Sequence, residues 1–115
     1  MNPLLIFAED ENTREALKSA LSTHLPLIVT EDRAQCLEAI GQKIPIYKAF
    51  IGVRTIKNAA DLNIFGEIAA LRPGLKMIAV GDQHTEGTAV EAVERGAAGY
   101  MLLPLNNAEI LTAAR

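Results

Sequence analysis

The stretch LLIFAEDENTREALKSAL, residues 4–21, joins a short apolar run to a segment with helical spacing. Its first part, Leu4–Ala8, has the length and composition of a strand that is buried on both faces. Asn12 and Glu15 then form the pair of residues that begins many helices, each side chain bonding to the backbone of the other. The apolar stripe of that helix follows at Ala16, Leu17, Ala20 and Leu21. The stretch therefore predicts a buried strand followed by an amphipathic helix.

The same strand and helix unit recurs through the chain. Four more apolar runs have the length of strands: Leu27–Thr30, Ala49–Val53, Lys76–Gly81 and Gly99–Leu103. Helical stripes follow them at Ala34, Leu37 and Ile40, at Leu62, Phe65, Ile68 and Ala69, at Ala89, Val90, Ala92 and Val93, and from Asn106 or Asn107 onward. We expect the middle three helices to end at Gly41, in a left-handed cap, at Arg72, Pro73 and Gly74, and at Gly96.

Strict alternation of strands and helices determines the fold class. Successive strands run parallel when right-handed crossovers connect them, and the crossover helices cover both faces of the sheet. The sequence therefore predicts a doubly wound, flavodoxin-like (βα)5 domain of the α/β class over residues 1–115, with a five-stranded parallel sheet in the order 2-1-3-4-5. The last helical segment has no stop signal before Arg115, which is also the pattern of a fragment cut from a longer multidomain protein.

Composition and charge exclude several classes of protein. The chain has 115 residues, half of them hydrophobic, which is enough for one domain with a substantial core. The net charge is −3 and the basic residues are scattered, so this domain alone has no basic face for nucleic acid. The single cysteine, Cys36, excludes an internal disulfide and a zinc site built on several thiolates. Without a signal peptide or an apolar run of membrane-spanning length, we expect a soluble cytoplasmic protein that does not enter a membrane.

Candidate functional residues lie where the predicted strands end, because ligands of doubly wound sheets bind outside the carboxyl ends of the strands. Those ends carry Glu9 and Asp10; Val53, Arg54 and Thr55; Gly81, Asp82 and His84; and Leu103 and Pro104. No glycine-rich loop follows the first strand, and its two acids would repel a phosphate, which argues against a dinucleotide. No nucleophile with a paired base stands out, so we do not expect an enzyme.

Two motifs resemble the receiver domain of two-component response regulators, and the resemblance covers essentially the whole chain. AEDENTREAL, residues 8–17, is similar to the acidic pair and first helix of that family, and ERGAAGYMLLP, residues 94–104, to its passage into the fifth strand. The resemblance implies an aspartate at the end of the third strand that takes a phosphoryl group from a kinase phosphohistidine. It also implies Mg²⁺ on the acidic pair, a hydroxyl after the fourth strand and a lysine before the proline, which offset the negative charge of the transferred group.

Three of those chemical groups are missing here. The phosphoacceptor position falls on Val53, or with a slip of one on Gly52 or Arg54, and none of these residues can form an acyl phosphate. The hydroxyl position falls on Gly81 and the lysine position on Leu103. We therefore interpret the chain as a degenerate pseudo-receiver that acts in signal transduction by protein contact, without aspartyl phosphorylation.

Two alternatives to the pseudo-receiver remain open. One is a working phosphorelay receiver with an atypical phosphoacceptor, for which Asp61 is a displaced candidate. The other is a ligand-sensing module at the carboxyl edge of the sheet.

The surviving acids, Glu9 and Asp10, have two interpretations. They are either a residual Mg²⁺ site, to which Asp82 and His84 add ligands, or surface carboxylates near a helix start. In the second case Arg54 pairs with them and its cation takes the place of the metal. We expect no firmly bound cofactor, and Mg²⁺ is the one candidate.

The resemblance carries further expectations for the fifth strand and its neighbours. Tyr100 stands at the family's aromatic switch position, and we expect it to turn inward and fill the space beside Gly81; the alternative is a half-buried ring with its hydroxyl in water. Leu103–Pro104 is expected to be a cis peptide. The face of the fourth helix, fifth strand and fifth helix serves receivers as a contact surface, which implies a protein partner, an attached output domain or a homodimer.

Overall fold

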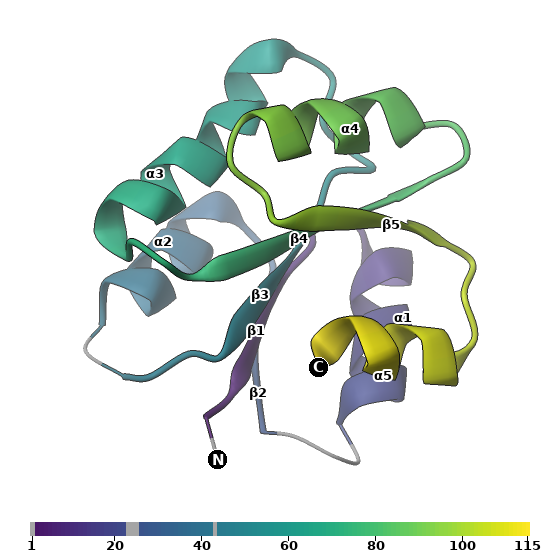
Figure 1. The fold of residues 1–115 in the computed structure, drawn as a ribbon, viewed down its shortest axis with the longest axis horizontal. Helices are drawn as coiled ribbons and strands as arrows, with labels where there is room; N and C mark the ends of the chain where they lie inside the picture. The colour runs from purple at the N-terminus through teal and green to yellow at the C-terminus, as the bar shows by residue number, and fades with distance from the viewer. Residues whose placement is uncertain (1, 23–25, 43) are drawn as a thin grey trace.

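The computed structural model describes residues 2–22, 26–42 and 44–115, and it shows a parallel five-stranded sheet (Figure 1). The strands are β1 (Leu4–Phe7), β2 (Leu27–Thr30), β3 (Lys48–Gly52), β4 (Lys76–Asp82) and β5 (Gly99–Leu103). Their spatial order is β2-β1-β3-β4-β5, and every neighbouring pair is parallel. The predicted fold class and strand order are confirmed.

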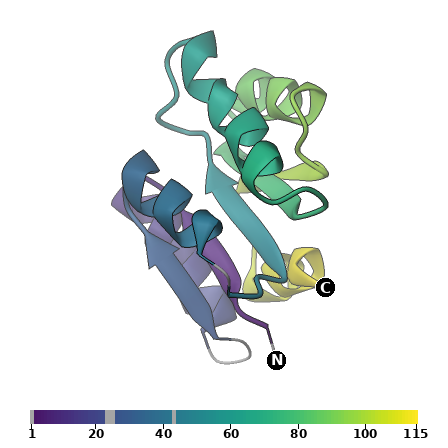
Figure 2. The same ribbon diagram turned by 90° about the vertical axis from the view of Figure 1, so that its left-hand side faces the viewer.

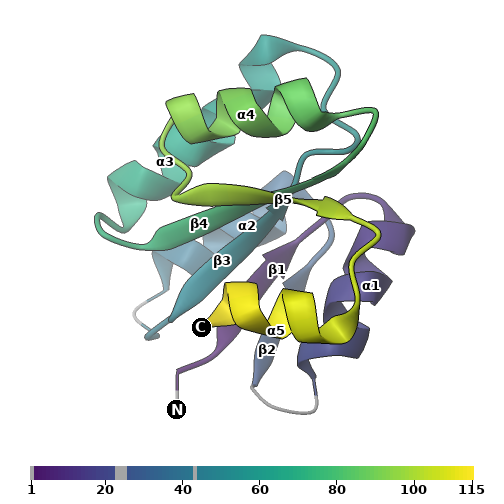
Figure 3. The ribbon, with the colours of Figure 1, turned by 45° about the vertical axis from the view of Figure 1, so that its right-hand side comes forward.

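The helices form a layer on each face of this sheet. They are α1 (Glu11–Leu21), α2 (Arg33–Gly41), α3 (Asn63–Leu71), α4 (Glu86–Glu94) and α5 (Asn107–Ala114), with a 3₁₀ turn η1 (Ala59–Leu62) before α3. Helices α1 and α5 lie against each other on one face, and α2, α3 and α4 cover the other (Figures 1 and 3). In the side view, α2 and α3 lie next to each other on the same face of the sheet (Figure 2). No helix in the described part of the chain is long and apolar enough to cross a membrane.

Side chains that alternate along each strand fill two separate cores. Toward α1 and α5 the sheet contributes Ile6, Phe50, Val80 and Met101, which pack with Leu17 and Ile110. Toward the other helices it contributes Leu5, Phe7, Ala49, Ile51 and Ala79, which pack with Phe65 and Ile68. The strands read as continuous apolar runs because both of their faces are buried. Because β1, β3 and β4 are neighbours in the parallel sheet, their carboxyl ends lie side by side.

The start of α1 differs from the sequence prediction. Asp10, and not Asn12, is the N-cap: its Oδ2 accepts hydrogen bonds from the Thr13 backbone N–H at 3.0 Å and from the Thr13 hydroxyl at 2.7 Å. Strand β1 ends at Phe7 and the helix begins at Glu11, so the chain has already turned when it reaches Asn12. An aspartate at this position satisfies the free N–H groups of the first turn as well as an asparagine does.

The end of α2 also differs from the prediction. Left-handed backbone occurs at Gly74, with φ of +88°, and at Gly96, with φ of +125°, but Gly41 is the last residue of regular helix. At this end the Arg72 guanidinium donates to the carbonyl oxygen of Ile40 in the last turn and to those of Gln42 and Ile44 just after the helix. A left-handed glycine cap is therefore not needed.

The outer face of α4 carries apolar side chains that the predicted stripe placed inside. Ala89 and Ala92 are fully buried, whereas Val90 is 41% and Val93 37% exposed. Similarly, Ala34 of α2 and Ala69 of α3 are exposed. The small alanines let α4 lie close to the sheet, which leaves the two valines on its solvent side.

Candidate functional site

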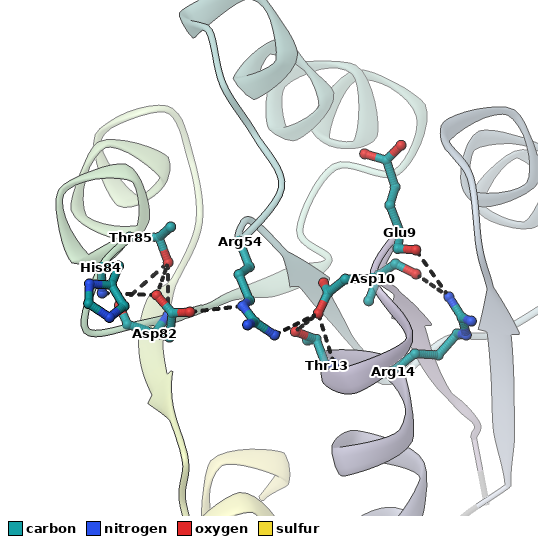
Figure 4. A network of polar contacts seen from close by, with 9 residues as sticks. Glu9, Asp10, Thr13, Arg14, Arg54, Asp82, His84 and Thr85 are labelled. Carbon is teal, nitrogen blue, oxygen red and sulfur yellow. Dashed lines mark hydrogen bonds and ion pairs between the residues drawn. The ribbon is translucent and has the colours of Figure 1, made fainter.

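The carboxyl ends of β1, β3 and β4 bring one arginine and two aspartates together (Figure 4). Arg54 Nη1 lies 3.3 Å from Asp10 Oδ2, and Arg54 Nε lies 2.8 Å from Asp82 Oδ2. The arginine side chain is 41% exposed, whereas the two aspartates are only 18% and 19% exposed. The predicted pairing of Arg54 with Asp10 is present, and Asp82 is a second partner of the same guanidinium.

Asp10 uses its charge in two ways at once. Its Oδ2 accepts from the backbone and the hydroxyl of Thr13 and also contacts Arg54. A carboxylate at a helix N-terminus is stabilised by the free N–H groups there and by the helix dipole. Asp10 is therefore held on both sides by groups of this chain.

Asp82 is held by an equally dense set of donors. Its Oδ1 accepts from the His84 backbone N–H at 2.9 Å and from the Thr85 hydroxyl at 3.0 Å, and the Thr85 oxygen in turn accepts from the Asp82 backbone N–H at 2.8 Å. Burial acts to raise the pKa of Asp82, but the Thr85 and His84 hydrogen bonds and the Arg54 charge outweigh it and hold this pKa below its ordinary value. Asp82 is therefore ionised at neutral pH and fixed in place.

Glu9 does not join this network, although it is adjacent to Asp10 in sequence. Its side chain is exposed and points away from Arg54 (Figure 4), with Oε1 3.5 Å from the Thr55 hydroxyl. The backbone around it is held by Arg14, which donates to the carbonyl of Ala8 at 2.9 Å and to that of Glu9 at 3.4 Å. The two acids thus face different directions. Among the described residues, no three acidic, histidine or cysteine side chains are close enough to hold a metal ion.

The three positions at which the resemblance implies a phosphoacceptor, a hydroxyl and a lysine have distinct surroundings. Val53 is fully buried directly after β3, and its backbone N–H donates to the carbonyl of Val80. A Cβ atom on Gly81 would lie only 2.8 Å from the Thr85 hydroxyl, so that hydroxyl occupies the space next to the glycine. Leu103 is partly buried and precedes Pro104 in a cis peptide, as expected.

The expectation that Tyr100 fills the space beside Gly81 is wrong. Tyr100 is 42% exposed and its hydroxyl lies 3.5 Å from Glu86 Oε2. Thr85 already takes the space, which leaves no room for an aromatic ring. The alternative interpretation of Tyr100 as a partly buried ring with an exposed hydroxyl fits the structure. The role of Thr85 escaped the sequence analysis, although a hydroxyl three residues after Asp82 is a signal for this turn.

The remaining candidates lie at the edges of the site. Asp61 is exposed in the turn η1, and its backbone N–H is bound by the Asn58 side chain. It borders a pocket of about 330 Å³ together with Glu9, apart from the Arg54 network. His84 is exposed and contributes to the network through its backbone.

An open pocket of about 590 Å³ adjoins the network next to α1 and the segment that follows β5. Arg54, Asp82, His84, Leu103 and Leu105 are among the residues that line it. The carboxyl edge of the sheet thus combines an internal ion-pair network with an accessible cavity.

Comparison with known proteins gives structural matches only. No protein-family model and no curated protein matches the sequence. Among solved structures, the receiver domain of NtrX from Brucella abortus has a TM-score of 0.83 at 21% identity, covering 96% of this chain and 93% of that one. A CheY-like receiver domain from Methanospirillum hungatei has a TM-score of 0.80 at 19% identity, covering 98% and 90%. An adenylate cyclase from Rhodopirellula baltica has a TM-score of 0.82 at 19% identity, covering 99% and 85%.

The lengths of these neighbours differ widely. The structure of NtrX in complex with ADP contains a longer chain. The match to it covers 99% of the present chain but only 26% of the NtrX chain. At these identities the similarity establishes the receiver fold of the chain.

Proposed function

We propose that this chain is a degenerate response-regulator receiver domain that acts in signal transduction through protein contact, without phosphorylation of an aspartate. One observation carries the proposal: the Arg54 guanidinium lies between Asp10 and Asp82 at the strand ends, where the receiver fold would hold a metal ion. The chain supplies its own cation there. At the phosphoacceptor position itself, Val53 provides no acceptor oxygen.

Phosphoryl transfer to a carboxylate requires an acceptor oxygen and cations that offset the charge gathered in the transition state. At the end of β3 this chain has the buried isopropyl group of Val53, which has no lone pair to attack phosphorus. At the end of β5 it has Leu103 in place of an ammonium group. The two aspartates that remain are engaged by donors of the chain, so a Mg²⁺ ion would have to displace Arg54.

A receiver without phosphoryl chemistry still offers a rigid surface for other proteins. On the face of α4 and β5, the partly exposed apolar side chains of Val90, Val93 and Tyr100 lie among polar residues. A surface of this kind is typical of a protein contact site. The partner is a separate protein, a second copy of this chain or an output domain in the same polypeptide. The receiver-like domain itself would work in the cytoplasm and catalyse no reaction.

NtrX, in which a receiver domain is one part of a longer chain, provides the model for an attached output domain. If the present chain is likewise one part of a longer protein, its signal passes through the α4 and β5 face to that neighbour. The identity of the output would follow from the full gene product.

Incubation with acetyl phosphate and Mg²⁺, followed by intact-mass measurement, tests the absence of phosphorylation. We expect an unchanged mass under conditions in which a working receiver domain, run in parallel, gains a phosphoryl group. A hydroxylamine-sensitive adduct on this chain would contradict the proposal and favour the atypical phosphoacceptor. The Asp61→Asn variant would then show whether Asp61 carries the adduct.

The contact surface has its own test. Sedimentation of the wild type and of a Val90→Asp, Val93→Asp double variant over a range of concentrations measures self-association through this face. Dimers that the double variant abolishes would identify a homodimer. Monomers at all concentrations would instead direct the search to a different protein or an attached domain.

A further inference from the structure

The pocket beside Arg54 has the size and lining of a small-molecule site. Its volume of about 590 Å³ falls within the range of roughly 300–1,000 Å³ that ligand sites occupy. Part of its lining is apolar and consists of Ala16, Leu103, Pro104 and Leu105. The lining also includes a few polar residues, among them Asn12, Arg54 and His84. A pocket lined by apolar side chains and a few polar groups suits an amphipathic ligand.

Arg54 has hydrogen-bonding capacity left over for such a ligand. Of its three nitrogens, Nε contacts Asp82 and Nη1 contacts Asp10, while Nη2 has no hydrogen-bond partner among the described residues. Both N–H groups of Nη2 can therefore donate hydrogen bonds to a ligand. Because the two ion pairs fix the guanidinium plane, these donors are oriented before a ligand arrives.

The charge balance at the rim determines the class of ligand. Arg54 carries one positive charge, and Asp10 and Asp82 carry two negative charges, so this group of three is net negative. A phosphate or carboxylate would be repelled by the aspartates and would compete with them for the guanidinium. A cation would be attracted by this net charge, but it brings no acceptor for the N–H groups of Nη2 and is repelled by the guanidinium that carries them. An uncharged acceptor avoids both penalties.

We propose that this pocket binds an uncharged amphipathic small molecule, which places a carbonyl oxygen on Nη2 of Arg54 and a flat apolar body against Ala16, Leu103 and Leu105. Such a ligand would strengthen the bridge between the ends of β1, β3 and β4, since it contacts the guanidinium that joins them. The inference goes beyond the contact function proposed above and does not depend on it. The pocket would bind in the same way if the chain were phosphorylated elsewhere.

Benzamide is a suitable probe, because benzoate and benzamidinium have the same ring with a negative or a positive charge. In NMR titrations of the whole chain, benzamide should give saturable shifts of the Ala16, Leu103 and Leu105 methyl groups. A dissociation constant in the millimolar range is expected for so small a ligand. Benzoate and benzamidinium should each bind at least several-fold more weakly. Tighter binding of either ion, or shifts scattered over the surface, would overturn the proposal.

A matched pair of variants separates this pocket from unspecific binding. Ala16→Leu places a larger side chain into the pocket while keeping a good helix former on α1, so it should abolish the benzamide shifts. Ala70→Leu makes the same change at an exposed position of α3, on the opposite face, and should leave them unchanged. Amide spectra of both variants establish that they are folded. Unchanged binding by a folded Ala16→Leu variant would contradict the assignment.

Discussion

Arg54 places a permanent cation at the carboxyl edge of the sheet. Its guanidinium contacts two carboxylates from different strand ends. Without a cation between them, Asp10 and Asp82 would repel each other. At the scale of single residues, the abrupt acidic end of the first strand is thus compensated by an arginine that lies 44 positions away in the sequence.

Replacing Arg54 with methionine should make this edge of the sheet responsive to Mg²⁺. The variant keeps an unbranched side chain without a charge and leaves the two aspartates uncompensated, and two carboxylates bind Mg²⁺ weakly. We expect saturable amide shifts of Asp10 and Asp82 at millimolar Mg²⁺ in the variant and a loss of about 1 kcal/mol in the free energy of unfolding, since both ion pairs are partly exposed. Arg54→Lys, which retains the charge, is the control and should respond little. Equal responses of the wild type and the methionine variant would show that Arg54 does not replace a metal.

Asp82 should make the stability of the domain depend on pH in acid. Burial opposes ionisation, but Thr85, His84 and Arg54 together hold the pKa of Asp82 below 3.8. As the pH falls through 3.8, the unfolded chain takes up the proton before the folded chain does, and the stabilisation present at neutral pH is lost. Urea unfolding should therefore show the wild type more stable than Asp82→Asn at neutral pH, with a difference that shrinks in acid. A difference that is the same at all pH values would refute this role.

At the scale of elements, the junction of β4 and α4 places the Thr85 hydroxyl in the space next to Gly81. Thr85 is the N-cap residue of α4, yet its hydroxyl does not cap the helix and turns back to Asp82. The same oxygen lies where a side chain on Gly81 would begin. A side chain at residue 81 would therefore conflict with the Thr85 hydroxyl, and one of the two would have to move.

A double-mutant cycle on this junction should be non-additive. Gly81→Ser and Thr85→Ala alone should each lower the free energy of unfolding by about 1 kcal/mol, the first through a steric conflict and the second through lost hydrogen bonds. Combined, they should cost clearly less than the sum, because the serine enters the space that the threonine leaves. Gly87→Ser is the control for replacing a glycine with serine, because no atom lies within 4 Å of the Cβ that is added there. Additive effects in urea unfolding would contradict the shared space.

The end of α2 depends on a side chain from α3. Arg72→Met removes the donor to the carbonyl groups of Ile40, Gln42 and Ile44, and we expect it to lower the free energy of unfolding by about 2 kcal/mol. Hydrogen exchange at the last turn of α2 should accelerate at the same time. Arg95→Met on α4, where the arginine contacts only side chains, is the matched control and should cost less. Similar losses in both variants would argue against a capping role.

At the scale of the whole molecule, the fold could be predicted from the sequence and the contacts of the site only in part. Two strands have the predicted bounds, namely Leu27–Thr30 and Gly99–Leu103. They were predictable because strands buried on both faces consist of continuous apolar runs. Convergence of the strand ends follows from the parallel sheet, so Arg54 and Asp10 could be placed near each other. Whether they form an ion pair depends on the directions of their side chains, and the pattern of residues in the sequence does not specify those directions.

The contacts that escaped prediction join residues through local turns or across long distances. Thr85 was overlooked because the hydroxyl was sought on Gly81, whereas the turn after β4 brings it from four residues further along the chain. Arg72 contacts Ile40 at the end of α2, although the two residues are 32 positions apart in the sequence. Helix and strand periodicity does not predict contacts between such distant residues. Asp10 replaced Asn12 as the cap because the strand ended earlier than its apolar run.

The central claim is that Arg54 places an internal cation at the strand ends, where the resemblance to receiver domains implies a metal ion and a phosphoryl group. The most direct test is the amide NMR spectrum of the wild-type chain during titration with Mg²⁺ and beryllofluoride, which imitates a phosphoryl group on an aspartate. The claim predicts no saturable shifts in the residues that follow β1, β3 and β4. Saturable shifts at Asp10, Arg54 and Asp82, reached together near equimolar beryllofluoride, would contradict it.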